Sequence, residues 1–461
     1  MTTERPFSVR GKRVTVVGAA RSGVAAAELL VRRGATVTLS EVRDQLDDED
    51  RLRAGGVELE LGGHHEGTFT GADLIVMSPG VPTRQPVIEA ARSAGVSVIG
   101  ELELASRWLR GKVIAITGTK GKSTTATLTG RMLEAGGHRV LVGGNIGPAL
   151  SAQVDESTED TIHVVEASSF QLEATETFRP WIAVLLNFSP DHLDRHESVE
   201  EYARAKSRVF ARQTDEDWAV LNADDPATLA LAAGGLSRRL LFSMRGEIAE
   251  GIVVDGDAIV RRTAAGREPL VPLSSIRLLG RHLIADVLAA AAVATLAGVD
   301  AASMTRAVEG FSGIEHVLEP AGDVGGVRFV NDSKATNVDA AHRAIESFDD
   351  GVVVILGGRF KGGSFRDLIE PLEARHATVV AIGEARPLIR DALEGRVTLH
   401  EAEDMSAAVR TAFASAAPGH TVVLAPACAS FDMFRDYAER GRVFKQEVLR
   451  LQEEWSVTRE Q

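Results

Sequence analysis

The clearest signal of the fold is Val113-Ile-Ala-Ile-Thr-Gly-Thr-Lys-Gly-Lys-Ser-Thr124. Its apolar, β-branched beginning predicts a buried strand, and the residues after the turn have the apolar spacing of a helix. At the turn, backbone N–H groups and the helix N-terminus can hold phosphate oxygens, while Lys122 offsets their charge and Ser123 reaches Mg²⁺. Ile116 stands where the full phosphate-loop pattern has another glycine, so the motif is a short form. The residues expected to hold the phosphates are Gly118, Thr119, Lys120, Gly121, Lys122, Ser123 and Thr124.

Strands and helices alternate on both sides of this segment. Strands are expected at 12–17, 36–39, 73–77, 112–117, 139–142, 162–166, 182–187, 327–330, 352–356, 378–382 and 421–424, and helices at 22–33, 122–133, 199–212, 284–297 and 303–310. Short alternating runs between about Leu236 and Leu279 indicate a small antiparallel sheet appended to the parallel one. The pattern predicts an α/β protein of three domains. Residues 1–100 and 314–461 should be Rossmann-like, and residues 101–313 should form a central phosphate-loop ATPase domain with a mostly parallel sheet.

Composition restricts the class of partner. The balance of 51 Lys and Arg against 65 Asp and Glu gives a net charge of −14, which argues against nucleic acid because phosphate backbones are held mainly by basic residues. The single cysteine, Cys428, excludes an internal disulfide and suits a reducing compartment. The N-terminus lacks the apolar stretch of a signal peptide, and the most apolar helical segment, 284–296, is too short to span a bilayer. We expect a cytoplasmic monomer without a membrane partner.

Polar residues end two of the expected central strands. Glu166 ends one of them, and Asp191 and His192 follow the end of another. The carboxyl ends of parallel strands meet at one crevice, which is where open α/β sheets bind ligands. Ser123, Glu166 and His192 would there be oxygen and nitrogen ligands of a divalent cation beside the ATP phosphates.

Five further blocks of sequence carry a resemblance to a known family. They are Glu166-Ala-Ser-Ser-Phe-Gln-Leu-Glu173, Asn187-Phe-Ser-Pro-Asp-His-Leu-Asp-Arg-His196, Asn331-Asp-Ser-Lys-Ala-Thr-Asn337, Ser78-Pro-Gly80 and Ala427-Cys-Ala-Ser-Phe-Asp432. Together with GTKGKST they resemble, in order and from end to end, the blocks of the Mur ligases, above all the branch that adds D-glutamate. The resemblance implies an ATP-dependent ligase of cytoplasmic peptidoglycan precursor synthesis. It would join D-glutamate to UDP-N-acetylmuramoyl-L-alanine through an acyl phosphate.

The resemblance also implies roles for individual residues. Catalysis would rest on Lys122, Glu166, His192 and Lys206. Two Mg²⁺ sites would be formed by Ser123, Glu166, His192 and Lys206, with Lys206 carbamylated so that it offers anionic oxygen rather than a repelled ammonium. ATP would also contact Asp286, Asp332 and Lys334. The UDP substrate would contact Arg21, Ser22, Arg43, Ser78, Pro79, Gly80, Asn145, Gln171 and His192. D-Glutamate would contact Thr336, Lys361, Ser430 and Tyr437.

The chain departs from the family pattern on the side that receives the nucleotide. Leu283 and Asp286 stand where asparagines are expected after Gly280-Arg-His282, and Val317 stands where an arginine is expected. An ionised Asp286 could accept a hydrogen bond from the adenine amino group but could not donate one to a ring nitrogen. We therefore expect a weaker purine pocket than the family usually has.

Three other interpretations remain open. A Mur-type ligase that adds a different amino acid, or one that resembles folylpolyglutamate synthase, would share the phosphate loop. A regulatory nucleotide-binding module would lack a third domain bearing Lys334 and Lys361. A dehydrogenase is a third interpretation, and it rests on Gly18-Ala-Ala-Arg-Ser-Gly23 followed by Glu41. In that motif, however, Ala20 replaces the glycine that lets the backbone approach a pyrophosphate.

Overall fold

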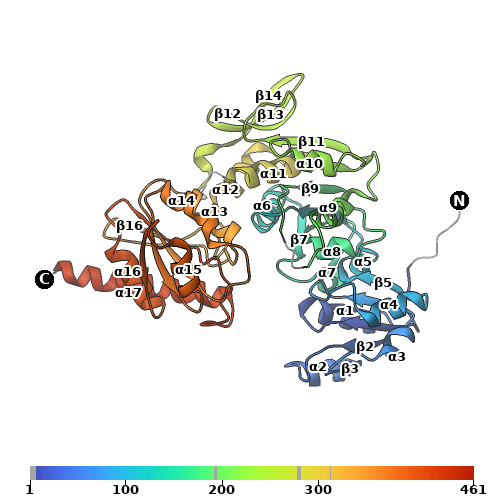
Figure 1. Cartoon of the computed structure of the whole chain (residues 1–461). Coiled ribbons are helices and arrows are strands. Elements are labelled where there is room, and N and C mark those ends of the chain that lie inside the picture. The colour runs from blue at the N-terminus through green and yellow to red at the C-terminus, as the bar shows by residue number, and fades with distance from the viewer. Residues whose placement is uncertain (1–6, 192–194, 278–281, 312, 461) are drawn as a thin grey trace. The chain divides into compact units, whose positions relative to one another are not determined.

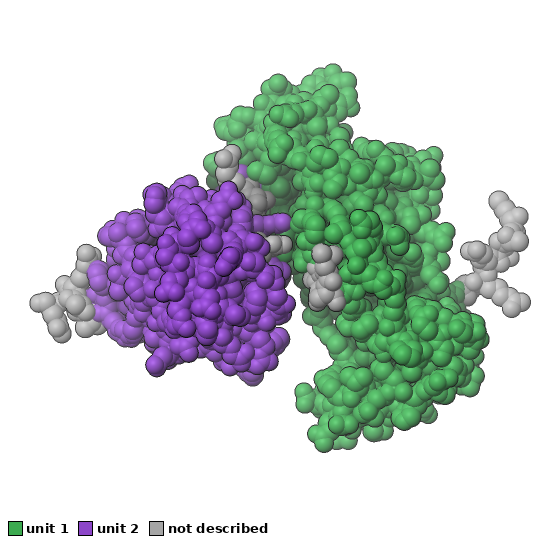
Figure 2. All heavy atoms as spheres, viewed as in Figure 1, with its two compact units in different colours: residues 1–275, 285–310 green, residues 276–284, 311–461 purple. Residues whose placement is uncertain are grey.

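A computed structural model of the chain describes residues 7–191, 195–277, 282–311 and 313–460. It is an α/β protein with three sheets, as expected. The chain forms two compact units, residues 1–275 with 285–310 and residues 276–284 with 311–461 (Figure 2). The first two sheets lie in the first unit and the third sheet lies in the second.

The N-terminal sheet is wholly parallel, with strand order β3-β2-β1-β4-β5. Its elements are β1 (Arg13–Val17), α1 (Arg21–Arg32), β2 (Thr36–Ser40), α2 (Glu49–Ala54), β3 (Val57–Glu60), α3 (Glu66–Thr70), β4 (Leu74–Met77), α4 (Pro86–Ser93), β5 (Ser97–Gly100) and α5 (Glu101–Ser106). The strand order reverses direction between β1 and β4, which is the point where doubly wound sheets open a ligand crevice.

The central sheet has nine strands in the order β14-β13-β12-β11-β10-β9-β6-β8-β7. Its first half contains β6 (Lys112–Thr117), α6 (Lys122–Ala135), β7 (Arg139–Gly144), α7 (Leu150–Gln153), β8 (Thr161–Glu166), α8 (Ser169–Glu173), β9 (Ile182–Leu185) and α9 (Val199–Ser207). Its second half contains β10 (Trp218–Asn222), α10 (Pro226–Leu231), β11 (Arg238–Ser243), β12 (Gly251–Asp255), β13 (Ala258–Thr263), β14 (Gly266–Pro272), α11 (His282–Leu296) and α12 (Ala301–Glu309). Because β6 lies between β8 and β9, the phosphate loop, Glu166 and the segment after β9 share one sheet edge.

The antiparallel strands expected between Leu236 and Leu279 are present as β12, β13 and β14 (Figure 1). As expected, they extend the central sheet. Strand β11 pairs in parallel with β10, and β12 pairs in parallel with β11, so the antiparallel order begins only after β12. The tight turn between Asp255 and Ala258 explains the switch, because a two-residue connection can join only antiparallel neighbours.

The C-terminal sheet has the order β15-β16-β20-β17-β18-β19, parallel except for the edge strand β15. Its elements are β15 (Glu319–Val324), β16 (Val327–Asn331), α13 (Val338–Glu346), β17 (Val352–Gly357), α14 (Ile369–Glu373), β18 (Thr378–Ile382), α15 (Arg386–Leu393), β19 (Thr398–Glu401), α16 (Met405–Ala414), β20 (Thr421–Leu424) and α17 (Tyr437–Glu460). Strand β15 and the 24-residue helix α17 are absent from the sequence expectations. Residues 319–324 contain Pro, Gly and Asp, which weaken a strand signal and suit an edge position.

Apolar packing joins the first two sheets within their shared unit. Leu29 of α1 lies in the same buried cluster as Leu102 of α5 and Leu150 of α7. This packing does not test the expected domain boundaries at residues 100 and 313, which stay predictions. Among the described residues, no helix is long and apolar enough to cross a membrane.

Candidate active site

The phosphate loop forms a tight turn between β6 and α6. Gly118 and Gly121 have positive φ values of 152° and 82°, which favour glycine. A Cβ on Gly121 would lie 2.2 Å from Oδ1 of Asp286, so a side chain has no room there. Helix α6 starts at Lys122, and its N-terminus points its unsatisfied N–H groups toward this turn. The side chain of Thr124 is buried, so only its backbone is suited to an anion.

Asn187, which follows β9, shapes this loop from the neighbouring strand. Its Oδ1 accepts hydrogen bonds from the backbone N–H groups of Thr119 at 3.1 Å and Lys120 at 2.9 Å, and its Nδ2 donates to the carbonyl of Lys120 at 3.1 Å. The Thr119 hydroxyl donates to the carbonyl of Ser189 at 3.0 Å. Sequence reasoning assigned no role to Asn187. The signal that could have found it is its place as the first polar residue after a fully apolar strand beside β6.

Two lysines contact carbonyls of the loop. Lys122 Nζ donates to the carbonyl of Thr119 at 2.9 Å, and Lys206 Nζ, from α9, donates to that of Gly118 at 2.7 Å. Lys206 is only 1% exposed. Its burial, with the charge of Lys122 nearby, lowers its pKa well below the usual range of a lysine. The lowered pKa raises the neutral fraction of the Lys206 amine above that of a solvated lysine.

Glu166 occupies the carboxyl end of β8 and is 1% exposed. Its Oε1 accepts from Nδ2 of Asn145 at 2.7 Å, and the Asn145 carbonyl accepts from the Arg21 guanidinium at 3.3 Å. Its Oε2 is buried and has no hydrogen-bond partner within the described part of the chain. A buried carboxylate oxygen without a donor is costly, and a divalent cation is the partner that such an oxygen fits.

Of the other expected metal ligands, Ser123 lies in the first turn of α6, beside the loop. His192, expected to bind both metal and the UDP substrate, lies outside the described residues. Asp191, which precedes it, forms an ion pair of 3.3 Å with Lys120 of the phosphate loop. The segment after β9 is thus tied to the loop by both Asn187 and Asp191.

The three departures from the family pattern have distinct positions. The Asp286 carboxyl is 4% exposed and packs against Gly121, and burial raises its pKa well above the usual range of an aspartate. Leu283 belongs to a buried apolar cluster with Val330 and Ala335 of the second unit. Val317 forms an isolated bridge with Ile314 and is partly exposed. The apolar surroundings explain a leucine at 283. Asp286 therefore lies beside the phosphate loop, and its expected contact with adenine stays a prediction.

At the N-terminal switch point, the turns after β1 and β4 contact one another. The hydroxyl of Ser78 donates to the carbonyl of Gly18 at 2.9 Å. Glu41 accepts from the N–H of Ala19 at 2.7 Å and from the guanidinium of Arg43 at 3.2 Å. Burial opposes ionisation of Glu41, but the bonds from Arg43 and Ala19 outweigh it and lower the pKa to about 2. Glu41 is thus engaged with its own turn, whereas a dinucleotide fold would use it for a ribose.

The remaining residues expected near the UDP substrate lie around these turns. Ser22 is the second residue of α1, and Pro79 and Gly80 follow Ser78. Gln171 is 3% exposed and serves in a capping box of α8, where its Oε1 accepts from the backbone N–H of Ser168 at 3.0 Å. Its side chain therefore has a local structural role whatever else it contacts.

In the second unit, the loops after three adjacent parallel strands are bonded together. The loop after β16 carries Thr336, the loop after β17 carries Lys361, and the loop after β20 carries Ser430. The N–H of Ala427 donates to the carbonyl of Ala335 at 2.9 Å, and Arg359 and Ala429 form a two-way bridge. The structure thus brings three of the four residues expected for D-glutamate onto loops that contact one another.

Buried Arg440 of α17 supports two of these loops. Its guanidinium donates to the hydroxyl of Ser333 at 2.9 Å, the carbonyl of Ser333 at 2.8 Å and the carbonyl of Cys428 at 3.0 Å. Tyr437, the fourth expected residue, begins α17 and is 39% exposed, and its carbonyl accepts from Ser333 at 2.7 Å. Arg440 was not found from the sequence, since a lone helical arginine is ordinarily solvated.

The residues expected for ATP in this unit lie on the loop after β16. Asp332 is 7% exposed and accepts from the N–H of Leu318 at 3.2 Å. Burial raises its pKa to about 7, against the opposing effects of that bond and of Lys334. The backbone N–H of Lys334 donates to the carbonyl of His316 at 3.1 Å.

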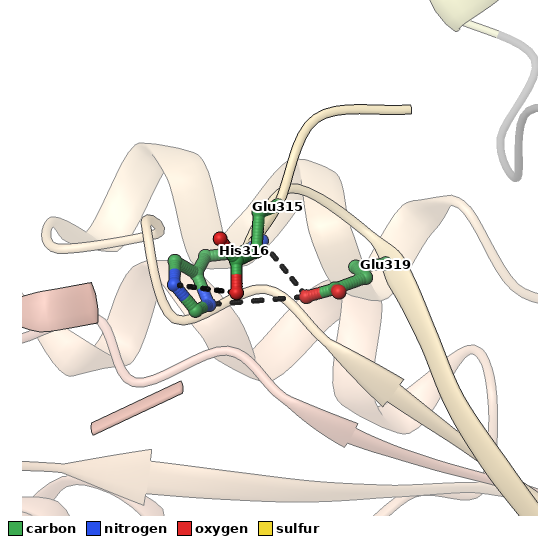
Figure 3. A group of neighbouring side chains, drawn as sticks. All are labelled: Glu315, His316 and Glu319. Atoms are coloured by element: carbon green, nitrogen blue, oxygen red, sulfur yellow. Dashed lines mark hydrogen bonds and ion pairs between the residues drawn. The ribbon is translucent and has the colours of Figure 1, made fainter. Parts of the chain in front are cut away.

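Glu315, His316 and Glu319 form a cluster with the spacing of metal ligands (Figure 3). Lys445 of α17 already occupies the position of a cation, because its Nζ donates to Glu315 at 2.9 Å and to Glu319 at 2.8 Å. Asn331 Nδ2 contacts Nδ1 of His316 and donates to Glu319, both at 2.9 Å. The cluster therefore fastens the segment before β15 to β16 and α17, and it gives no reason to place a metal there.

Comparisons with known proteins agree with this arrangement. Family models match residues 12–100 as a Mur ligase MurD-like N-terminal domain, residues 116–294 as a Mur ligase middle domain and residues 318–428 as a Mur ligase glutamate ligase domain. A protein of Acidobacterium capsulatum named UDP-N-acetylmuramoylalanine–D-glutamate ligase is 49% identical over 448 residues, covering 96% of this chain and 97% of the relative. One of the same name from Koribacter versatilis is 47% identical, covering 97% and 99%.

Solved structures support the fold. A pseudomurein peptide ligase type C from Methanothermus fervidus superimposes with a TM-score of 0.60 at 18% identity, covering 96% of this chain and 100% of the other. The similarity to the curated relatives extends over nearly the whole of both sequences and includes all three matched domains. The chain therefore belongs to the Mur ligase family.

Proposed function

We infer that this enzyme is an ATP-dependent ligase that adds D-glutamate to UDP-N-acetylmuramoyl-L-alanine in peptidoglycan precursor synthesis. The observation that carries the inference is 49% identity, over 96% of the chain, to a relative named for that activity. The glycine-rich turn, the buried carboxylate of Glu166 and the buried Lys206 at one sheet edge supply the chemistry that such a ligase needs.

The reaction follows from the poor reactivity of a carboxylate toward an amine. One oxygen of the alanyl carboxylate attacks the γ-phosphorus of ATP, the bond to ADP breaks, and an acyl phosphate forms. The D-glutamate amine then attacks the acyl carbon, loses a proton and forms a tetrahedral intermediate that expels phosphate. In these steps the protein forms no covalent bond to the reactants. Its residues therefore mainly position the reactants and offset their charge.

The residues near the phosphate loop suit the phosphoryl transfer. We assign the β- and γ-phosphates to the backbone N–H groups of residues 118–124 and to the side chain of Lys122. Ser123, Glu166 and His192 would hold Mg²⁺, and the orphaned Oε2 of Glu166 is the observation that fits it. Bound Mg²⁺ would offset the charge that develops on the transferred phosphoryl group.

Lys206 is proposed as a carbamate. Its neutral amine would attack CO₂, form an N–C bond and release one proton, leaving an anionic group. The buried position and the lowered pKa support this, since only the neutral amine is a nucleophile. The carbamate, with His192, would complete a second Mg²⁺ site.

The substrates are assigned to separate parts of the chain. The UDP moiety is proposed to contact Arg21, Ser22, Arg43 and the turn of residues 78–80, with Asn145 and Gln171 near the muramoyl group. ATP would also reach Asp332 with its ribose, and would contact Lys334 and Asp286. D-Glutamate would contact Thr336, Lys361, Ser430 and Tyr437, since a cation and several hydroxyl groups suit an amino acid with two carboxylates. We propose domain boundaries at residues 100 and 313. We also propose that the enzyme is a monomer and that it lies in the cytoplasm, where ATP and nucleotide-linked precursors are found.

Phosphate release is the direct test. With UDP-N-acetylmuramoyl-L-alanine and ATP present, we expect release to depend on D-glutamate and to be far slower with L-glutamate or L-lysine. Equal turnover with L-lysine would overturn the assignment of the amino acid. Absence of any amino-acid-dependent release would overturn the ligase assignment itself.

A further inference from the structure

Arg195, in the segment between β9 and α9, spans from the central sheet to a turn of the N-terminal sheet. Its guanidinium donates to three consecutive carbonyl oxygens, those of Pro79 at 3.4 Å, Gly80 at 3.2 Å and Val81 at 2.6 Å. These carbonyls belong to the turn that follows β4. Three acceptors on one planar guanidinium fix both the position and the orientation of that turn.

The other side of Arg195 is held by α8. Its guanidinium carbon lies 4.6 Å from the ring centre of Phe170. The Phe170 ring also stacks on the ring of His196, with centroids 5.3 Å apart, and Nε2 of His196 lies 3.0 Å from the hydroxyl of Ser169. Helix α8 follows Glu166 by only a short link, so the aromatic stack connects Arg195 to the segment that carries the buried carboxylate.

The turn that Arg195 grips is itself joined to the glycine-rich turn after β1. The hydroxyl of Ser78 donates to the carbonyl of Gly18, and a Cβ on Gly18 would lie 2.6 Å from Cγ2 of Val81. Because the two turns contact one another, a nucleotide bound at them would fix or displace both turns as one unit. The three bonds from Arg195 would transmit that constraint through the Phe170 ring to helix α8, which directly follows the strand that ends at Glu166.

We propose that Arg195 is a positioning residue that couples occupancy of the turn at residues 78–81 by a uridine diphosphate group to cation binding beside the phosphate loop. The proposal rests on the proposed function for the identity of both ligands. Coupling of this kind is reciprocal, so the nucleotide should tighten the cation by the same factor as the cation tightens the nucleotide.

The test measures Mn²⁺ affinity by electron paramagnetic resonance with and without UDP. UDP is the suitable probe because it lacks the muramoyl-alanine carboxylate, and the Mn²⁺ that its diphosphate binds in solution is subtracted with an enzyme-free titration. In the wild-type enzyme we expect UDP to tighten Mn²⁺ about fivefold or more. In Arg195→Ala the factor should fall to about one, and guanidinium ion at low millimolar concentration should restore part of it.

Arg84→Ala is the matched control. Arg84 lies at the same junction and pairs with Glu197 and Glu201, but it donates to none of the three turn carbonyls. Its removal should leave the coupling factor at the wild-type value. If the alanine variant does not fold, Arg195→Gln replaces it in the test, because glutamine keeps most of the aliphatic packing. This variant should also lose the coupling. In steady-state assays, both Arg195 variants should raise the KM for the UDP substrate more than Arg84→Ala does.

Two outcomes would overturn the proposal. One is a folded Arg195 variant in which UDP still tightens Mn²⁺ by the wild-type factor. The other is a wild-type enzyme that binds UDP and Mn²⁺ independently. Neither outcome touches the proposed function, which would still be supported by D-glutamate-dependent phosphate release from the wild-type enzyme.

Discussion

Replacing Lys206 separates its chemical role from its structural one. The side chain is 1% exposed, and its amine donates to the carbonyl of Gly118 at 2.7 Å. Lys206→Ala removes the amine and most of the packing, whereas Lys206→Met removes the amine and keeps a chain of similar length. If the amine must become a carbamate, both variants should be nearly inactive, while their stabilities should differ.

The expected stability costs follow from the contacts. Either change leaves the buried carbonyl of Gly118 without this donor, at a cost of about 1–3 kcal/mol. The alanine variant also loses Cγ, Cδ and Cε, which at about 0.8 kcal/mol per buried methylene adds about 2.4 kcal/mol. We therefore expect Lys206→Met to be more stable than Lys206→Ala by about 2 kcal/mol, with equal loss of activity.

The lowered pKa favours carbamylation of Lys206, because a larger share of its amine is neutral than in a solvated lysine. With the ordinary lysine pKa of 10.5, only about one amine in a thousand is neutral at pH 7.5, and each unit of lowering raises that fraction about tenfold. Wild-type enzyme equilibrated with ¹³C-labelled CO₂ should therefore show a carbamate carbon signal by NMR that both variants lack. Short carboxylates such as propionate should partly restore phosphate release to Lys206→Ala, whose cavity can admit them, and not to Lys206→Met.

The assay combines phosphate release, denaturant unfolding and the NMR signal on the same preparations in CO₂-depleted and CO₂-enriched buffer. Wild-type turnover by Lys206→Met in CO₂-depleted buffer would refute the reasoning. A stability loss equal in both variants would show instead that the packing term was misjudged, without affecting the chemical role.

Three other predictions concern separate regions. Burial lowers the pKa of His163 to about 4 from an ordinary 6.5, so between these pH values the unfolded chain gains a proton and the folded chain does not. The free energy of unfolding of the wild type should therefore fall, relative to that of His163→Gln, by at most about 1.4 kcal/mol per pH unit as the pH drops from 6 to 4. Urea unfolding at a series of pH values measures this difference. Lys361→Ala should lose a charged hydrogen bond of about 1.5–3 kcal/mol and raise the KM for D-glutamate about ten- to 150-fold in initial-rate assays, and an unchanged KM would remove Lys361 from the site. Val317→Arg, alone and with Asp286→Asn, should lower the KM for ATP with little change in kcat, because the added contacts act equally in ground and transition states; no tightening by either form would refute the expected weak purine pocket.

The phosphate loop and the strand-end residues could be predicted because they obey local rules. A strand, a glycine-rich turn and a helix start are readable from adjacent residues, and parallel β6 and β8 bring the loop and Glu166 to one edge. The position of Asp286 is a different case. Its packing against Gly121 depends on where α11 lies in the fold, which no local pattern specifies.

Residues that support the site from a distance were missed for the same reason. Asn187, Arg195 and Arg440 read as ordinary polar residues after a strand, in a loop and in a helix. Each acquires its role from carbonyl or N–H groups far away in the chain, such as the carbonyls of Pro79 and Gly80 for Arg195. Backbone groups carry no side-chain identity, so their partners leave no trace in the sequence pattern.

By itself, the amino-acid sequence determined the α/β class, the three-sheet arrangement, the phosphate loop and the family, because hydrophobic periodicity and short motifs are local properties of the chain. Only the tertiary structure decided that β11 and β12 pair in parallel before the antiparallel strands begin, and that the Lys206 amine is buried against the Gly118 carbonyl. It also decided that Glu166 keeps one oxygen without a hydrogen-bond partner among the described residues. These features arise when segments distant in sequence exclude water from one another, since burial and the pKa shifts that follow from it belong to the packed chain and not to any segment of it.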